Sequence, residues 1–248
     1  MISVMGSPTQ IKSLFWTSYF VASIAVLGVP FAFLGGSPFY LLGRVFRPAR
    51  NLADRILLRG VQVLMAVQPW YSAKIEIPRL PGRVLVVSNH RSHLDVFLLL
   101  SRIPGLRIVA KQSLFGIPFL GFMMRMMEQI PVTSGSLDGF YGAMEIVRAK
   151  LRAGETVHVF PELTRCEPGY DGVRNFSLLP FQIAIQEKAR VLPVMVKGTD
   201  SVWGKGELGI HFRRSIAVKA LDLIDAQEFK TAQDLKTAVQ SRIERALQ

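Results

Sequence analysis

The chain has one cysteine, Cys166, among its 248 residues. A single cysteine cannot form an internal disulfide, and a cysteine-rich zinc site is excluded as well. The sequence also lacks a Gly-x-Ser-x-Gly nucleophile elbow, a paired-histidine metal motif and a phosphate loop. We therefore expect no serine nucleophile of that kind, no metal site and no resident cofactor.

Acidic residues are scarce too, since 18 Asp and Glu stand against 30 Lys and Arg, for a formal net charge of +12. Half of the chain is nevertheless hydrophobic. A basic and apolar chain fits a partner that is both anionic and apolar, as membrane lipid is. Helix-turn-helix, zinc-finger and RNA-binding signatures are absent, so we expect no nucleic-acid partner.

A long stretch without charge lies near the N-terminus, between Lys12 and Arg44. Within it, the run from Leu14 to Gly43 exceeds the ~20 apolar residues that a spanning helix needs. This length favours a membrane-embedded segment over a cleaved signal peptide. Pro30 and Gly35-Gly36 interrupt its second half, which leaves a single tilted span and a re-entrant helical hairpin open, with a slight preference for the hairpin.

The segment that follows is rich in arginine. Its arginines stand among apolar residues at helical spacing, which is typical of a helix on an anionic membrane surface, although a core-facing helix with a solvated basic face gives the same pattern. The positive charge predicts that the rest of the chain is cytoplasmic, and the compact layout makes a bacterial inner membrane our expectation. We predict a membrane segment and interfacial helix over 1–72 and a second domain over 73–248. The arginines are Arg44, Arg47, Arg50, Arg55 and Arg59.

From about residue 73 onward, strand-like and helix-like segments alternate. Such alternation predicts an α/β fold with a mixed, mostly parallel sheet flanked by helices. The expected strands are 84–87, 107–110, 156–160, 191–196 and a final extended stretch over 210–221, and the expected helices are 93–102, 137–152, 176–187 and 229–247.

Polar residues follow the first of these strands directly. A β-branched apolar run ends at Ser88, and His90 and Asp95 flank the junction between this strand and the next helix. Ligands of parallel sheets gather at the carboxyl ends of strands. We expect His90 to stand there as a group that can exchange a proton, with Asp95 placed to set its tautomer. Ser92 and Asp95 also form a capping box, so a purely structural role for Asp95 stays open.

A His-Asp pair without a serine elbow is suited to activating a hydroxyl of the substrate. Such a pair takes the proton from an alcohol as the alcohol attacks a thioester, with no covalent enzyme intermediate. The run from Leu114 to Met124 is too apolar, and too interrupted by glycine and proline, for a tidy surface helix. We expect it to pack in the core or to dip into lipid beside the site.

Four motifs carry a resemblance to a known family. Residues 89–95, NHRSHLD, resemble the NH-x-x-x-x-D signature of the glycerolipid acyltransferases, whose best-known members are the lysophosphatidate acyltransferases. Residues 110–121 resemble the lysine-bearing segment of that family, 160–165 (FPELTR) its FPEGTR motif, and 191–194 its proline-centred motif. All four occur in family order, over roughly 84–197, which makes coincidence improbable.

The resemblance implies a membrane-bound O-acyltransferase. It would move a fatty acyl group from acyl-CoA or acyl carrier protein to the hydroxyl of a lysolipid, first of all lysophosphatidate to give phosphatidate. His90 would be the general base and Asp95 its orienter. The residues implied to hold the substrate are Asn89, Lys111, Glu162, Thr164 and Arg165, and those implied to line the acyl groove are Leu114, Phe115, Phe119 and Phe122.

Two departures from the family pattern bear on the substrate. Leu163 replaces the glycine of FPEGTR, and because its side chain disfavours a positive φ, we expect a differently shaped loop. The second family motif usually ends in an arginine that helps to hold the acceptor phosphate, but the corresponding stretch, 130–135, has none. These departures keep two alternatives open: another acceptor (lyso-ornithine lipid, another lysophospholipid or an acyl-modified pigment), or an inactive lipid-binding protein on the same fold.

Overall fold

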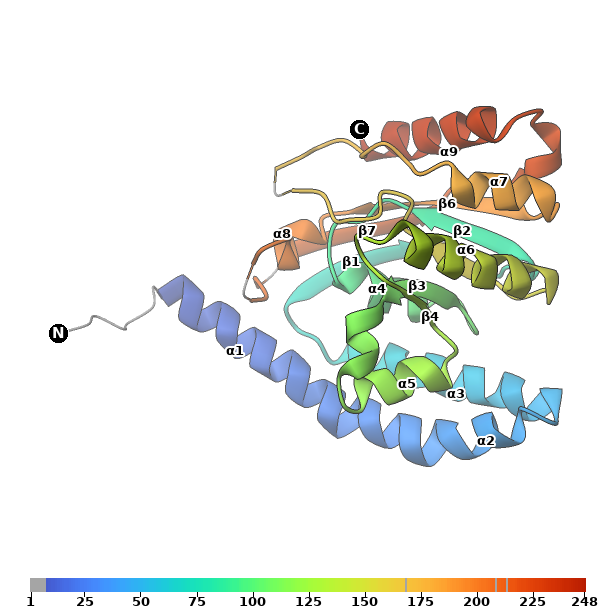
Figure 1. Cartoon of the computed structure of the whole chain (residues 1–248). Helices are drawn as coiled ribbons and strands as arrows, with labels where there is room; N and C mark the ends of the chain where they lie inside the picture. The colour runs from blue at the N-terminus through green and yellow to red at the C-terminus, as the bar shows by residue number, and fades with distance from the viewer. Residues whose placement is uncertain (1–7, 168, 208, 213) are drawn as a thin grey trace.

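The computed structural model describes residues 8–167, 169–207, 209–212 and 214–248. Its centre is an eight-stranded sheet in the order β1-β7-β6-β2-β5-β3-β4, with β8 beside β6 (Figure 1). Most neighbouring strands run parallel, while β7 and β8 run antiparallel to β6. The mixed, mostly parallel sheet is therefore confirmed. The strands are β1 Tyr71–Glu76, β2 Val84–Ser88, β3 Arg107–Lys111, β4 Ile130–Val132, β5 Val157–Val159, β6 Arg190–Lys197, β7 Arg214–Ala220 and β8 Ile224–Asp225.

The central strand β2 is buried on both faces, as its unbroken apolar run predicts. Val84 and Val86 pack into the core on one face of the sheet. Leu85 packs into the core on the other face, because successive side chains of a strand point to opposite sides. Burial on both faces requires helices on both faces.

Helices cover the sheet on both sides (Figure 1). Apolar side chains of α6, α7 and α9 fill one core. The other core takes side chains from α1 and α4. The helices are α1 Pro8–Ser23, η1 Ile24–Gly28, η2 Phe31–Gly36, α2 Ser37–Leu42, α3 Arg47–Ala66, α4 Leu94–Leu100, η3 Gln112–Gly116, α5 Leu120–Met126, α6 Leu137–Arg152, α7 Leu179–Gln186, α8 Asp200–Trp203, η4 Ala226–Glu228 and α9 Ala232–Leu247.

Most elements expected from the sequence lie where the patterns place them, and α6 has the expected bounds. Ser136 caps this helix, since its hydroxyl accepts a hydrogen bond from the Gly139 amide at 3.0 Å. The sequence patterns missed β1, which lies at the edge of the sheet, and β4, which has only three residues. A strand of three residues such as β4 carries too little apolar periodicity to be recognised. The residues of β1 do alternate between half-buried and exposed, so that strand was overlooked and not hidden.

The uncharged N-terminal segment forms one unbroken helical run from α1 through η1 and η2 to α2. The slight preference for a re-entrant hairpin within it was therefore wrong. The chain turns back only after Leu42, and α3 then packs along η2 and α2. The glycines that interrupt the pattern provide close contact instead of a turn: a Cβ on Gly36 would lie 2.9 Å from the Leu57 side chain of α3.

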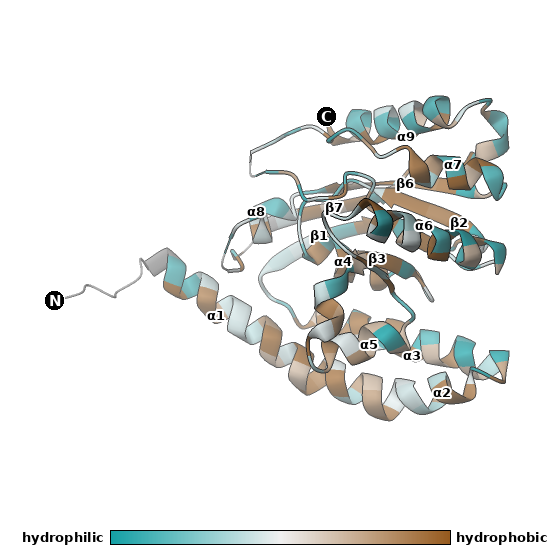
Figure 2. Ribbon diagram, in the orientation of Figure 1, coloured by the Kyte–Doolittle hydropathy of each residue, from teal (hydrophilic) through white to brown (hydrophobic). Residues whose placement is uncertain are grey.

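The N-terminal helix is also fastened to the body of the protein. Phe20 is buried against the Trp70 and Phe97 rings. Closer to the N-terminus, Thr17 Oγ1 accepts a hydrogen bond from the Ile210 amide at 3.0 Å. Figure 2 shows hydrophobic residues, interspersed with pale ones, along most of the run from α1 to α2, whose first turns are more polar. The helix therefore lies along the domain and presents an apolar outer side.

The basic helix α3 has two different faces. Its small and apolar residues, such as Ala53 and Leu57, are buried, whereas Arg55 and Arg59 are exposed. Arg50 does not face outward as the interfacial-helix interpretation supposed, because its guanidinium pairs with Glu128 at 2.8 Å and Glu155 at 3.1 Å.

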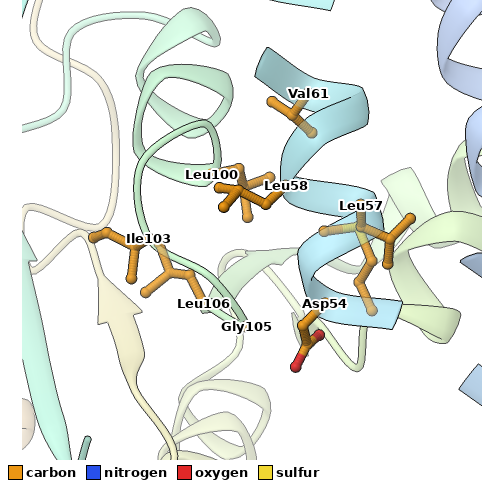
Figure 3. A pocket seen from close by; sticks show the side chains of 9 residues that line it. Asp54, Leu57, Leu58, Val61, Leu100, Ile103, Gly105 and Leu106 are labelled. Carbon is orange, nitrogen blue, oxygen red and sulfur yellow. The ribbon is translucent and has the colours of Figure 1, made fainter. Parts of the chain in front are cut away.

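Figure 3 shows where α3 meets the rest of the fold. Side chains of α3 face Leu100 at the end of α4 and the loop that contains Gly105, and most of this seam is apolar. The exception is Asp54, whose carboxylate lies beside Gly105 so closely that a Cβ there would approach its Oδ2 to 2.9 Å. The docking of α3 thus combines apolar packing with buried charge.

Candidate active site

The carboxyl ends of four parallel strands bring the predicted site together. β2 lies between β5 and β6, and β3 lies on the other side of β5. His90 follows β2, the FPELTR segment follows β5, and Lys111 ends β3. The topology therefore gathers at one edge of the sheet residues that are up to 75 positions apart, from His90 to Arg165.

His90 and Asp95 form a hydrogen-bonded pair. His90 Nδ1 lies 2.9 Å from Asp95 Oδ2, with the Asp95 side chain fully buried and 16% of the His90 side chain exposed. A proton on Nδ1 that is donated to the carboxylate leaves the Nε2 lone pair free to accept. Among the residues that the structure describes, His90 Nε2 has no hydrogen-bond partner.

Asp95 has a second role that the sequence left as an alternative. Its Oδ2 accepts the backbone N–H of Arg91 at 2.8 Å and that of Ser92 at 2.9 Å. The hydroxyl of Ser92 in turn accepts the Leu94 amide at 3.1 Å. Capping and orienting are therefore compatible, because one carboxylate oxygen holds both the imidazole and the helix start.

Glu162 holds the backbone of His90 in place. Its Oε1 accepts the His90 amide at 2.7 Å, and its Oε2 accepts the Arg174 amide at 3.0 Å and the Cys166 thiol at 3.0 Å. Burial, together with this bond, raises the pKa of Cys166 to about 12, so the thiol keeps the proton that it donates. The buried carboxylate thus ties together two loops that the chain order separates.

The five expected substrate-binding residues fall into two groups. Asn89 and Glu162 are buried, and their side chains form hydrogen bonds with other groups of the protein. The Asn89 side chain forms two hydrogen bonds with the Val196 backbone, at 2.7 and 2.8 Å. These contacts indicate positioning, and direct contact with substrate stays a prediction for them. Lys111 is exposed, while Thr164 and Arg165 are half-buried.

Arg165 is a cation close enough to the dyad for its charge to matter there. Asp95 is among the charges that act on it, and Arg165 itself acts on His93. Burial lowers the pKa of its guanidinium, which nevertheless stays charged at neutral pH. Its Nη1 lies 3.5 Å from the Gly204 carbonyl, which leaves further N–H donors for a ligand.

The acyl-groove residues divide as well. Phe115 is buried and Leu114 is half-buried, whereas Phe119 and Phe122 are exposed on α5 and its N-terminal end. The two exposed rings contact Phe33 of the N-terminal helix, the Phe122 ring stacked on it at 4.7 Å. Phe119 and Phe122 thus extend the apolar outer side of α1–α2, and their role as groove wall stays a prediction.

Leu163 adopts the backbone that its side chain disfavours, with φ at +61°. The backbone at the position of the family glycine is therefore left-handed, which a glycine would adopt without strain, and the expected difference in loop shape stays a prediction. A left-handed backbone costs a non-glycine residue roughly 1–2 kcal/mol, part of which glycine gives back through its greater freedom when unfolded.

Because the Leu163 side chain is exposed, little packing is lost on its removal. Leu163→Gly should therefore raise the free energy of unfolding by about 0.5–1 kcal/mol. The midpoint of urea unfolding in detergent measures this, with Leu137→Gly at the start of α6 as an exposed control that should lose stability. A lower midpoint for Leu163→Gly would show that the leucine is held by contacts.

The sequence did not point to Arg91, which is buried and clamps the loop after β5. Its guanidinium donates to the carbonyls of Tyr170 and Gly172 and pairs with Asp200 at 3.3 Å. These partners are 79 to 109 positions away along the chain. The sequence shows only that an arginine lies between the motif residues His90 and Asp95, and this position does not reveal which distant groups it contacts.

Two aromatic side chains of β5 and its end were also missed. The Phe160 ring is stacked on His90 with centroids 3.7 Å apart. His158 is buried, with Nε2 2.9 Å from Ser88 Oγ, and its ring meets the edge of Phe160 at 4.3 Å. Burial lowers the pKa of His158 to about 3, so this histidine is neutral at physiological pH. A histidine inside an apolar strand was the available signal.

Comparison with known proteins gives consistent matches. A family model described as Acyltransferase matches residues 72–197. A chloroplastic 1-acyl-sn-glycerol-3-phosphate acyltransferase of Arabidopsis thaliana is 29% identical over 198 residues, which are 77% of this chain and 53% of that protein. The enzyme of the same name from Neisseria meningitidis serogroup B is 32% identical over 152 residues, which are 61% of this chain and 58% of that protein. The chain spans about half the length of the curated relatives that it matches.

Among solved structures, the crystal structure of the 1-acyl-sn-glycerophosphate acyltransferase PlsC from Thermotoga maritima aligns with a TM-score of 0.76. The alignment covers 96% of both chains at 25% identity. The similarity therefore includes the N-terminal helices as well as the sheet.

Proposed function

The chain belongs to the acyltransferase family, and from this premise we propose that it transfers an acyl group from a thioester donor to the free hydroxyl of 1-acylglycerol 3-phosphate. The observation that carries the proposal is the His90–Asp95 pair, whose Nε2 has no hydrogen-bond partner among the described residues, at the edge of the sheet where Lys111 and Arg165 also stand. The names of the similar enzymes support this acceptor.

The chemistry follows from the free Nε2. His90 Nε2 takes the proton of the acceptor hydroxyl while the oxygen attacks the thioester carbonyl, and Asp95 stabilises the imidazolium that forms. The tetrahedral intermediate collapses, the C–S bond breaks, and the imidazolium returns the proton to the leaving thiolate. The products are the ester and a free thiol, and no bond to the protein forms.

The acceptor phosphate needs cationic partners, and the stretch 130–135 has no arginine to supply one. We assign the phosphate to Arg165 and Lys111. Arg165 can donate two parallel N–H bonds to phosphate oxygens. Lys111 pairs in register with Val132 of β4, so its backbone lies beside the stretch that lacks the arginine, and its exposed side chain starts there. This placement is our reason for retaining a phosphate acceptor.

The test is an acceptor and donor panel with purified protein. Labelled acyl-CoA and acyl carrier protein are each offered with lysophosphatidate, lysophosphatidylcholine, lyso-ornithine lipid or no acceptor, and His90→Ala serves as the blank. Preferential formation of phosphatidate supports the proposal. Preference for another acceptor would reassign the substrate, and no transfer from either donor would leave a lipid-binding protein as the better interpretation.

We also propose that the protein works at the cytoplasmic face of a membrane, embedded from one side. The run Gln10–Leu42 is long and apolar enough to cross a membrane by length and composition, and only 22% of its most apolar window is buried. A crossing helix would have to leave the domain, yet Phe20 and Thr17 fasten this one along it. Exposed arginines of α3 suit the anionic cytoplasmic leaflet.

This membrane proposal predicts the effect of a single polar substitution. Leu34 is 81% exposed on η2, so Leu34→Ser should weaken partitioning into anionic vesicles by about tenfold or more. The matched control is Ile146→Ser, an exposed aliphatic residue of α6 on the opposite side of the sheet (Figure 1). Flotation across a lipid titration measures both, and equal partitioning of the two variants would contradict the proposed face.

A further inference from the structure

The Phe160 ring lies on the imidazole of His90. The centroids are 3.7 Å apart and the planes differ by 19°, which is a face-to-face arrangement. The register of the sheet produces it: Val87 pairs with Val159, so the residues that leave β2 and β5 emerge side by side. Stacking of this kind does not follow from the hydrogen bonds of the dyad, which fix only one edge of the imidazole.

Phe160 is itself held firmly. The neutral His158, tied by its Nε2 to Ser88, packs against it in a T-shaped contact with centroids 4.3 Å apart. Pro161 follows and restricts the Phe160 backbone to extended conformations. The Phe160 carbonyl accepts the Leu163 amide at 3.1 Å. The ring is therefore a fixed surface, and the imidazole rests on it.

We propose that Phe160 is a positioning residue for acyl transfer. Its ring keeps the imidazole of His90 in the plane that joins Nδ1 to Asp95 and turns Nε2 toward the substrate, and its π face favours the imidazolium that forms when His90 takes the hydroxyl proton. The catalytic consequence rests on the proposed function, whereas the effect on the charge of His90 does not.

The groups around His90 show why a neutral π face matters. Asp95 supplies the negative charge that favours the imidazolium, whereas Arg165 adds a positive charge close enough to act on Asp95 and on the neighbouring His93. A cation within about 6 Å of an aromatic centroid is attracted to the ring face, most strongly where water is excluded. Phe160 supplies this attraction without adding a proton acceptor that would compete for Nε2. The titratable or charged groups that face His90 are Asp95 and His93 from α4, His158 from β5, and Glu162 and Arg165 from the loop after β5.

Phe160→Leu removes the π face but keeps an apolar side chain of similar size, so water stays excluded. Loss of the attraction destabilises the imidazolium and lowers the pKa of His90 by about half a unit to one and a half units. The acid limb of kcat/KM, which needs neutral His90, moves to lower pH by the same amount. At its optimum, kcat falls by about threefold to thirtyfold, because the transition state carries the imidazolium.

The primary measurement is an NMR titration of histidine-labelled protein, which needs no acyl transfer. The chain has four histidines, and His90→Ala identifies the His90 signal. Phe160→Tyr keeps the π face and should keep the wild-type midpoint. Phe181→Leu is the matched control, because Phe181 is a buried ring stacked on Phe176 in the other core. It should lose stability without moving the His90 midpoint.

A lower His90 midpoint in Phe160→Leu, restored in Phe160→Tyr, supports the inference. An unchanged or higher midpoint in folded Phe160→Leu overturns it, and so does an equal fall in Phe160→Tyr, since the π face would not then be the cause. Failure of the proposed function would be seen differently: the wild type would show no acyl transfer, whereas the His90 midpoint could still be compared between the variants.

Discussion

Replacing His90 by alanine should lower kcat for acyl transfer by about 10²- to 10⁴-fold, the usual range for loss of a general base. The reason is geometric. His90 Nδ1 lies 2.9 Å from Asp95, which leaves Nε2 as the nitrogen that can accept a proton, and Nε2 has no hydrogen-bond partner among the described residues. The substitution also removes the stacked contact with the Phe160 ring, but it leaves the outer side of the N-terminal helices unchanged, so membrane partitioning should be unaffected. Initial rates with the donor and acceptor identified by the panel measure the loss.

Two further variants make this prediction specific. Asp95→Asn keeps the shape of the side chain but removes its charge, so it should also lower kcat strongly through the wrong tautomer of His90. His211→Ala is the control, since His211 is half-exposed and faces Glu207 at 3.3 Å instead of the dyad. Near-normal turnover in His90→Ala would contradict the general-base mechanism. An equal loss of kcat in His211→Ala would indicate a general effect of removing a histidine.

The sheet and the dyad were predictable from the sequence because each is encoded by neighbouring residues. The run before Ser88 is apolar at every position instead of at every second one, which indicates a central parallel strand buried on both faces. His90 and Asp95 lie only five positions apart in the chain. The rule that ligands gather at carboxyl ends then joins this junction to the FPELTR segment. Local pattern and a topological rule together were sufficient.

The parts of the site that were missed depend on contacts between distant residues. Glu162 holds the His90 amide across 72 positions, and Arg91 reaches Tyr170 across 79. Nothing near either residue in the chain reveals such a partner. The sequence therefore predicted a substrate ligand at Glu162, which stays a prediction, but it could not reveal that the same carboxylate holds the backbone of the site.

The path of the N-terminal helix was unpredictable for a related reason. Pro30 and Gly35-Gly36 are turn signals in isolation, but a long helix tolerates them where π-helical turns and a close neighbour absorb them. Whether these glycines form a turn or allow a close contact depends on the packing of α3 against them. The position of α3 in space cannot be read from the residues of the N-terminal helix. The same packing turns Arg50 inward to Glu128.

Arg107 should be the most costly single substitution for stability. Only 2% of its side chain is exposed, and its guanidinium pairs with Glu155 at 2.8 Å and Asp54 at 3.2 Å. It also donates to the Met127 carbonyl at 3.0 Å. The arginine therefore joins α3 to β3, to the turn after α5 and to the loop before β5. Removing one partner of a buried ion pair leaves the other charges buried without compensation.

We expect Arg107→Met to lower the free energy of unfolding by about 3–5 kcal/mol, and the Tm by about 10 °C for a chain of this size. Pairing it with Asp54→Asn should recover part of the loss, because the uncompensated carboxylate of α3 is then gone. Lys74→Met breaks an exposed pair with Glu76 and should leave the Tm almost unchanged, as exposed pairs contribute little. Thermal unfolding in detergent compares the three variants. If Arg107→Met were as mild as Lys74→Met, the ionic cluster would not be what fastens the N-terminal helices to the sheet, and the apolar seam around Leu100 would have to hold them alone.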